Sequence, residues 1–76
     1  MKIADYEQAL SNARKIERPE YRISALVKIA TECRRNGWGY DVIALEAFED
    51  ILQICREAGD RESEAVALAN IVSTSQ

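Results

Sequence analysis

Side chains that could carry out catalysis are scarce in this chain of 76 residues. It contains no histidine, which removes the commonest general base, the commonest metal ligand and any Ser–His or Cys–His nucleophile pair. Cys33 and Cys55 are not a Cys-x-x-Cys pair, so their spacing supports neither redox nor zinc chemistry. Glu46, Glu49 and Asp50 could cluster on one helix, but an exposed acidic face is the simpler interpretation. No glycine-rich phosphate loop is present, so we expect no enzyme, no metal site and no cofactor.

Residues suited to binding another protein are easier to find. Ser24, Lys28, Thr31 and Arg35 follow one another at steps of four, three and four residues, which places them in one polar stripe on a helix. Lys28 and Arg35, with Arg34 as a third candidate, would complement an acidic ligand. The alternative is an ordinary solvated helix face. We treat the stripe as a candidate surface for a protein or peptide partner.

Trp38 is a second candidate for partner binding. It lies between two glycines in the segment Gly37-Trp38-Gly39-Tyr40, which predicts a turn with unusual dihedral angles. An exposed tryptophan in a turn is a common interface anchor. Alternatively, its ring folds over the hairpin end and covers Tyr40.

The elements that must carry these residues are predicted to be four helices. Apolar residues recur at three- and four-residue steps through most of the chain, and no strand pattern competes. Pro19, Gly37 and Gly59 mark breaks between them, and Asp5, Asp41 and Asp60 are the expected N-caps. Short connections imply antiparallel neighbours. The predicted helices are Asp5–Glu17, Pro19 to about Asn36, Asp41 to about Ala58, and a fourth from Asp60 that frays at Ser73–Gln76.

Each predicted helix has an apolar stripe that we expect to face the core. Both cysteines belong to these stripes, and we expect them to be buried thiols without a disulfide. The last helix contributes the stripe Ala65, Leu68, Ala69, Ile71 and Val72.

Composition and charge limit the classes of partner. Apolar residues make up 47% of the chain and charged residues 30%, which is typical of a folded helical protein. No segment is apolar enough to span a membrane, and the first ten residues do not read as a signal peptide, so we expect a cytoplasmic protein without a membrane partner. The net charge of −3 argues against nucleic acid. Residues 1–38 carry +3 and residues 39–76 carry −6, which favours head-to-tail association or a basic face that meets an acidic peptide.

An internal repeat supports a more specific interpretation. At a shift of 42 residues, several positions are identical, among them Leu10, Arg14, Ala25, Leu26 and Ile29, which match Leu52, Arg56, Ala67, Leu68 and Ile71. The stretch Leu52–Ile71, with Gly59-Asp60 at its centre, resembles the long variety of tetratricopeptide repeat. The resemblance implies an all-α, right-handed stack of helical hairpins that binds a peptide in a concave groove. It also places Asn70 and Lys28 at equivalent groove positions, where Asn70 would hold a peptide backbone.

The repeat frames the chain as a single domain, residues 1–76, with one full hairpin at about 20–58 between two half-repeats. Fewer than about three repeats are marginal alone, so we expect a homo-oligomer, specifically a homodimer. Departures such as Cys33 at a usual aromatic position leave related helical repeats and a plain four-helix bundle as alternatives. For function, the leading hypothesis is an interaction scaffold. The alternatives are a purely structural self-assembly or docking domain, and a fragment of a larger signalling protein.

Overall fold

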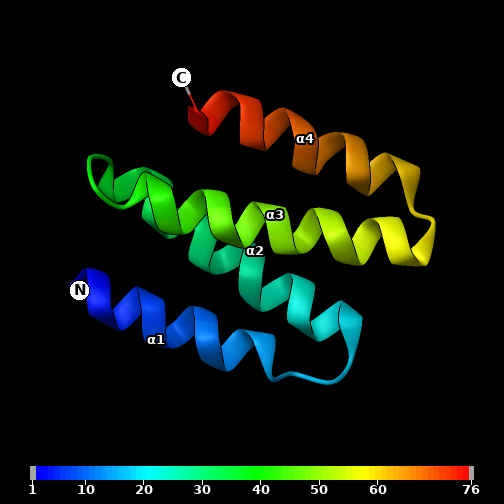
Figure 1. The fold of residues 1–76 in the computed structure, drawn as a ribbon, viewed down its shortest axis with the longest axis horizontal. Coiled ribbons are helices and arrows are strands. Elements are labelled where there is room, and N and C mark those ends of the chain that lie inside the picture. The colour runs from blue at the N-terminus through cyan, green and yellow to red at the C-terminus, as the bar shows by residue number, and fades with distance from the viewer. Residues whose placement is uncertain (1, 76) are drawn as a thin grey trace.

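The computed structural model describes residues 2–75 and consists of helices joined by short connections. The helices are α1 (Ile3–Arg14), α2 (Pro19–Asn36), α3 (Asp41–Ala58) and α4 (Arg61–Ser75). No strand occurs in the described range, so the all-α class and the four helices are as expected from the sequence. Successive helices reverse direction across the molecule (Figure 1).

The boundary of α1 differs from the prediction. The helix begins at Ile3 rather than after Asp5, and Lys2 is its N-cap residue. Asp5 is the third helical residue, and its carboxylate accepts a hydrogen bond from the Lys2 backbone nitrogen at 3.0 Å. The prediction of Asp5 as N-cap was therefore wrong. An acidic residue can also accept a hydrogen bond from a backbone N–H at the start of a helix when it stands at the third helical position. The helix also ends earlier than expected, at Arg14.

Glycines set the two later turns. Gly59 ends α3 in the left-handed conformation, with φ of 73°. Asp60 then caps α4, because its side-chain oxygen accepts a hydrogen bond from the Ser63 backbone nitrogen at 3.2 Å. At the α2–α3 turn, Gly37 has φ of 78°, which favours glycine. Tyr40, rather than Asp41, is the N-cap residue of α3.

The central element is α3, which contacts each of the other three helices. Helices α2 and α4 both pack on it, and α1 packs mainly on α2. The molecule is a flat slab with extents of 34 × 28 × 12 Å, and Figure 1 shows α1 and α4 on opposite sides of α3. The largest share of the buried core comes from α3, which supplies Ile43, Ala44, Ala47, Phe48, Ile51, Ile54 and Cys55.

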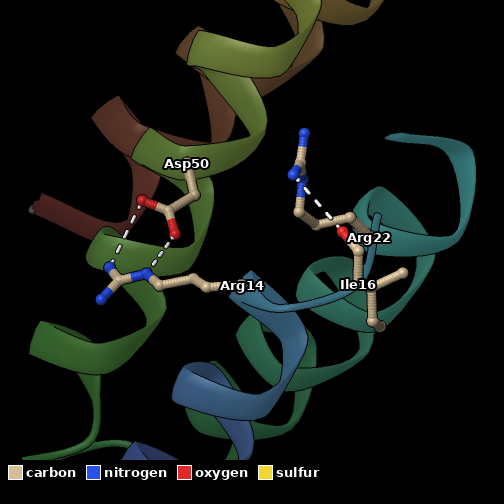
Figure 2. Close-up of polar contacts among 4 residues, drawn as sticks. All are labelled: Arg14, Ile16, Arg22 and Asp50. Carbon is tan, nitrogen blue, oxygen red and sulfur yellow. Dashed lines mark hydrogen bonds and ion pairs between the residues drawn. The ribbon is translucent and has the colours of Figure 1, made fainter. Parts of the chain in front are cut away.

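Polar contacts tie α1 to the rest of the fold. Figure 2 shows the Arg14 guanidinium facing the Asp50 carboxylate of α3, with N–O distances of 2.5 and 3.3 Å. In the same view Arg22 of α2 donates a hydrogen bond to the carbonyl of Ile16 at 3.4 Å. Asp50 thus has an arginine partner instead of belonging to a free acidic cluster. The ion pair is a direct polar contact between α1 and α3.

The orientation of α4 contradicts the predicted stripe. Ala67, which was not in that stripe, is the buried α4 residue among those described. Of the predicted residues, only Ile71 packs against the core. The other four are exposed: Ala65, Leu68, Ala69 and Val72. Apolar residues occur on two sides of this helix, so the pattern could not decide which side faces α3.

Two further observations concern the described residues as a whole. None of their helices combines the length and apolar character needed to cross a membrane. Cys33 and Cys55 are both buried and free of a disulfide, which agrees with the expectation of buried thiols.

Candidate partner-binding groove

A groove runs between α2 and α4, and α3 forms its floor. Its volume is about 710 Å³, within the range of roughly 300–1,000 Å³ that is typical of ligand pockets. Phe48, Ile51 and Cys55 form the floor, and all three are buried. They lie at steps of three and four residues, so one face of α3 presents them together. We call this feature the α2–α4 groove.

The two walls combine apolar and small polar side chains. On α2 the wall includes Ile23, Val27 and Thr31. On α4 it includes Val66 and Asn70. Val27 and Val66 remain 43% and 61% exposed, although both border an apolar floor. The groove therefore offers apolar surface that an added side chain would cover.

Arg34 joins the two walls at one end of the groove. Its guanidinium donates hydrogen bonds to the Asn70 side-chain oxygen at 3.3 Å and to the Ser73 hydroxyl at 3.0 Å. Because Arg34 lies in the last turn of α2 and Ser73 near the end of α4, the carboxyl ends of both helices meet here. The bridge is a direct polar contact between the two walls at this end.

Charge is separated along the groove. Arg34 and Arg35 make the bridged end basic. Glu62, in the first turn of α4, also lines the groove and precedes Asn70 by about 12 Å along the helix axis. The groove thus has a basic end and an acidic end, with an apolar floor between them.

The structure brings some of the predicted binding residues together and separates others. Thr31, Arg35 and Asn70 line the groove. Ser24 and Lys28 are exposed on α2 and do not line it. Asn70 accepts a hydrogen bond from Arg34, so the side-chain oxygen that was expected to hold a peptide backbone is already engaged.

Trp38 lies outside the α2–α4 groove. It is 98% exposed, so its ring does not cover Tyr40. The ring of Tyr40 instead meets that of Tyr6 edge-on, with centroids 5.7 Å apart. The Tyr6 hydroxyl also accepts a hydrogen bond from Asn36 at 3.1 Å. The tyrosines close the hairpin end, and Trp38 is left in solvent.

Sequence reasoning missed Val27, Glu62 and Val66 as groove residues. The available signal was Ile23 and Val27, two apolar residues four apart on the flank of the main α2 stripe. A second apolar flank on a helix indicates a second contact surface. Val66 gave no such signal, because apolar residues occur on several sides of α4.

Cys55 is the thiol on the floor of the groove. Burial is the main cause that raises the pKa of the Cys55 thiol, and the negative charges of Asp60 and Glu64 act in the same direction. The thiol therefore stays protonated and unreactive at neutral pH. Within residues 2–75, no three side chains of the His, Cys, Asp or Glu type are placed to share a metal ion.

A smaller hollow of about 250 Å³ lies where α1, α2 and α3 meet. Arg14 and Asp50 line it, and they pair with each other there (Figure 2). Its main charged groups thus already have partners, and we regard the α2–α4 groove as the better candidate.

In comparisons with known proteins, no family model, curated protein or solved structure matches the chain.

Proposed function

We propose that this chain is a non-catalytic interaction module that captures a peptide or protein segment in the α2–α4 groove. The observation that carries the proposal is the groove of about 710 Å³ with its buried apolar floor. Val27 and Val66 are more than 40% exposed on its walls. Covering such side chains is favourable by about 25 cal/mol per Å² of apolar surface.

The 42-residue repeat supports a tetratricopeptide-like arrangement within this proposal. By the repeat, α2 and α3 form one hairpin, and α4 corresponds to α2. The resemblance implies that first helices of hairpins line the binding surface, and α2 and α4 are the two walls of the groove. The basic end at Arg34 and Arg35 suits an acidic segment. We place the protein in the cytoplasm, with a protein rather than nucleic acid as its partner.

Peptide display tests this function. A random library of peptides about 16 residues long, roughly 24 Å as a helix, is selected against the wild-type chain. Enriched peptides are then measured against Val66→Glu, which places a charge on the groove wall. Val42→Glu is the matched control, because Val42 is 62% exposed and Val66 is 61% exposed, and Val42 lies outside the groove.

We expect Val66→Glu to weaken binding at least tenfold, or about 1.4 kcal/mol, and Val42→Glu to leave it unchanged. Backbone amide shifts in NMR spectra should change at Val27, Thr31 and Val66 when peptide is added. A selection that enriches no peptide, or peptides that bind Val66→Glu as tightly as wild type, would refute the groove as the binding site.

Self-association is a second candidate function, favoured by the outer face of α4. This face consists of Ala65, Leu68, Ala69 and Val72, all exposed and without charge. In α1, by contrast, the exposed residues are mostly polar, and Gln8 and Asn12 bond to each other at 3.2 Å. Three of the exposed large apolar side chains, Val66, Leu68 and Val72, lie on α4, more than on any other helix, which favours a symmetric dimer through α4 over a head-to-tail chain.

Light scattering at micromolar concentration tests the dimer. Wild type should have the mass of two chains, and Val72→Glu should be a monomer. Val42→Glu, an equally polar change elsewhere, should remain a dimer. A monomeric wild type would rule out this second function and leave the groove proposal untouched.

A further inference from the structure

The groove also carries information about the shape and direction of what it binds. Building on the proposed function, we infer that the occupant is an amphipathic helix that runs antiparallel to α2 and α4. Its first turn is acidic and lies at the Arg35 end, and its last turn is basic and lies near Glu62. Three properties of the groove support this assignment.

The first property is the lack of backbone partners in the middle of the groove. Its walls are helices, so their interior backbone groups are already hydrogen-bonded within each helix. The floor and the central wall positions are apolar: Val27, Phe48, Ile51, Val66 and Ala67. An extended peptide there would bury N–H and C=O groups without partners, whereas a helix satisfies its own.

The second property is the arrangement of the helices around the groove. Helices α2 and α4 each pack on α3, and the Arg34 bridge shows that their carboxyl ends lie together. A helix laid between them contacts both walls and completes a bundle of four with α3. Phe48, Ile51 and Cys55 of the floor lie at helical spacing, so they can meet apolar residues at positions i, i+3 or i+4, and i+7 of the occupant.

The third property is the polarity of the ends. The bridged end holds the negative dipole ends of α2 and α4 together with the side chains of Arg34 and Arg35. The amino-terminal end of an incoming helix is the positive end of its dipole and is stabilised by acidic side chains. Placed at this end, it is attracted by both neighbouring dipoles, and its acidic residues face Arg35. A basic last turn then reaches Glu62.

The experiment uses a focused display library with fixed apolar positions at i, i+3, i+4 and i+7. Two residues at each end are either Glu or Lys. Exposed ion pairs and dipole contacts are individually weak, so we expect roughly a three- to tenfold enrichment of peptides with Glu first and Lys last. Because such peptides are also intrinsically more helical, the protein variants rather than the wild type alone decide the result.

Arg35→Glu combined with Glu62→Lys should enrich the opposite order of charges, with Lys first and Glu last. If circular dichroism shows that this variant does not fold, Arg35→Gln with Glu62→Gln should abolish the preference instead. Lys28→Glu is the matched control, since Lys28 is exposed on the same helix outside the groove lining, and it should keep the wild-type order.

A nitroxide label gives the direction of the best peptide independently of affinity. Attached to the peptide amino terminus, it should broaden the amide signals of Thr31 and Arg35. Attached to the carboxyl terminus, it should broaden those of Glu62 and Ser63. The reverse pattern overturns the orientation, and so does a charge preference that is unchanged in the variants. Equal binding by a peptide with a central proline would show an extended occupant. Failure of every peptide in both libraries overturns the proposed function as well.

Discussion

Two leucine-to-alanine substitutions give a sharp test of how α4 lies on the fold. Leu26 of α2 is 0% exposed, whereas Leu68 of α4 is 40% exposed. The two leucines correspond at the 42-residue shift, and the apolar pattern of the sequence assigns both to the core. The structure gives them different environments, so the same chemical change should have different costs.

The expected magnitudes follow from burial. At Leu26 the substitution removes three buried carbons and leaves a cavity, which costs about 2–5 kcal/mol. At Leu68 about 60% of the residue is covered. Three carbons at about 0.8 kcal/mol each, scaled by that fraction, give an upper limit of about 1.4 kcal/mol. Alanine is also the better helix former, so we expect a loss of about 1 kcal/mol.

Thermal unfolding followed by circular dichroism separates these values. In a domain of this size, 1 kcal/mol shifts the Tm by about 4–8 °C. Leu68→Ala should therefore lower the Tm by roughly that amount, and Leu26→Ala by at least twice as much. Each variant is measured at two protein concentrations that differ about tenfold, because a dimer raises the Tm with concentration.

Equal losses for the two variants at both concentrations would refute the orientation of α4 described above. A Leu68→Ala penalty that grows with concentration has another meaning. It would indicate that a second copy covers the outer face of α4, in agreement with the proposed dimer.

Three further predictions concern the turns. Trp38 is 98% exposed, so its fluorescence maximum should hardly move on unfolding. Trp38→Ala should change the free energy of unfolding, measured in urea, by less than about 0.5 kcal/mol. A blue-shifted fluorescence maximum in the native protein would contradict this exposure. Gly59 has φ of 73°, and an added Cβ would meet no atom within 4 Å. Gly59→Ala should therefore lower the free energy of unfolding, measured in urea, by about 1–2 kcal/mol from backbone strain alone. Gly59→Asn should lower it by less. The side-chain hydrogen bond with Ser63 is the main cause that holds the pKa of Asp60 below its ordinary value of 3.8. A carboxylate whose folded pKa is depressed stabilises the fold above its unfolded pKa and loses that contribution as the pH falls through the folded pKa. The Tm of wild type should therefore drop below about pH 4, and Asp60→Asn, which keeps a capping oxygen but cannot ionise, should show a shallower drop; an identical acid profile would refute the assignment.

The positions of the helices could be predicted from the sequence because they depend on local chemistry. Pro19 begins α2 because its fixed φ and missing N–H suit a first helical position. Gly59 ends α3 because it adopts the left-handed conformation at little cost, and Asp60 caps α4 through its side chain. Each of these effects involves residues that are neighbours along the chain. The predicted start of α1 was wrong by a few residues, because Asp5 can stabilise the start of a helix either as the N-cap or as the third helical residue.

The candidate site could be predicted only in part. Thr31 and Arg35 were identified because they belong to one polar stripe of α2, and Asn70 because the repeat aligns it with that helix. Val27 was missed because it lies on the flank of the main α2 stripe, and Val66 because apolar residues occur on several sides of α4. They become a binding surface only when two helices far apart in sequence are placed on the same face of α3.

The sequence by itself therefore determined four helices, their approximate ends and the buried cysteines, since periodicity and turn residues act locally. The tertiary structure decided which side of α4 meets α3, because that helix is apolar on more than one side and only packing can choose between them. That choice buries Ala67, exposes Leu68 and Val72, and brings Val66 and Asn70 opposite α2. The same choice brings Glu62 into the groove, at the end opposite to Arg35 of α2.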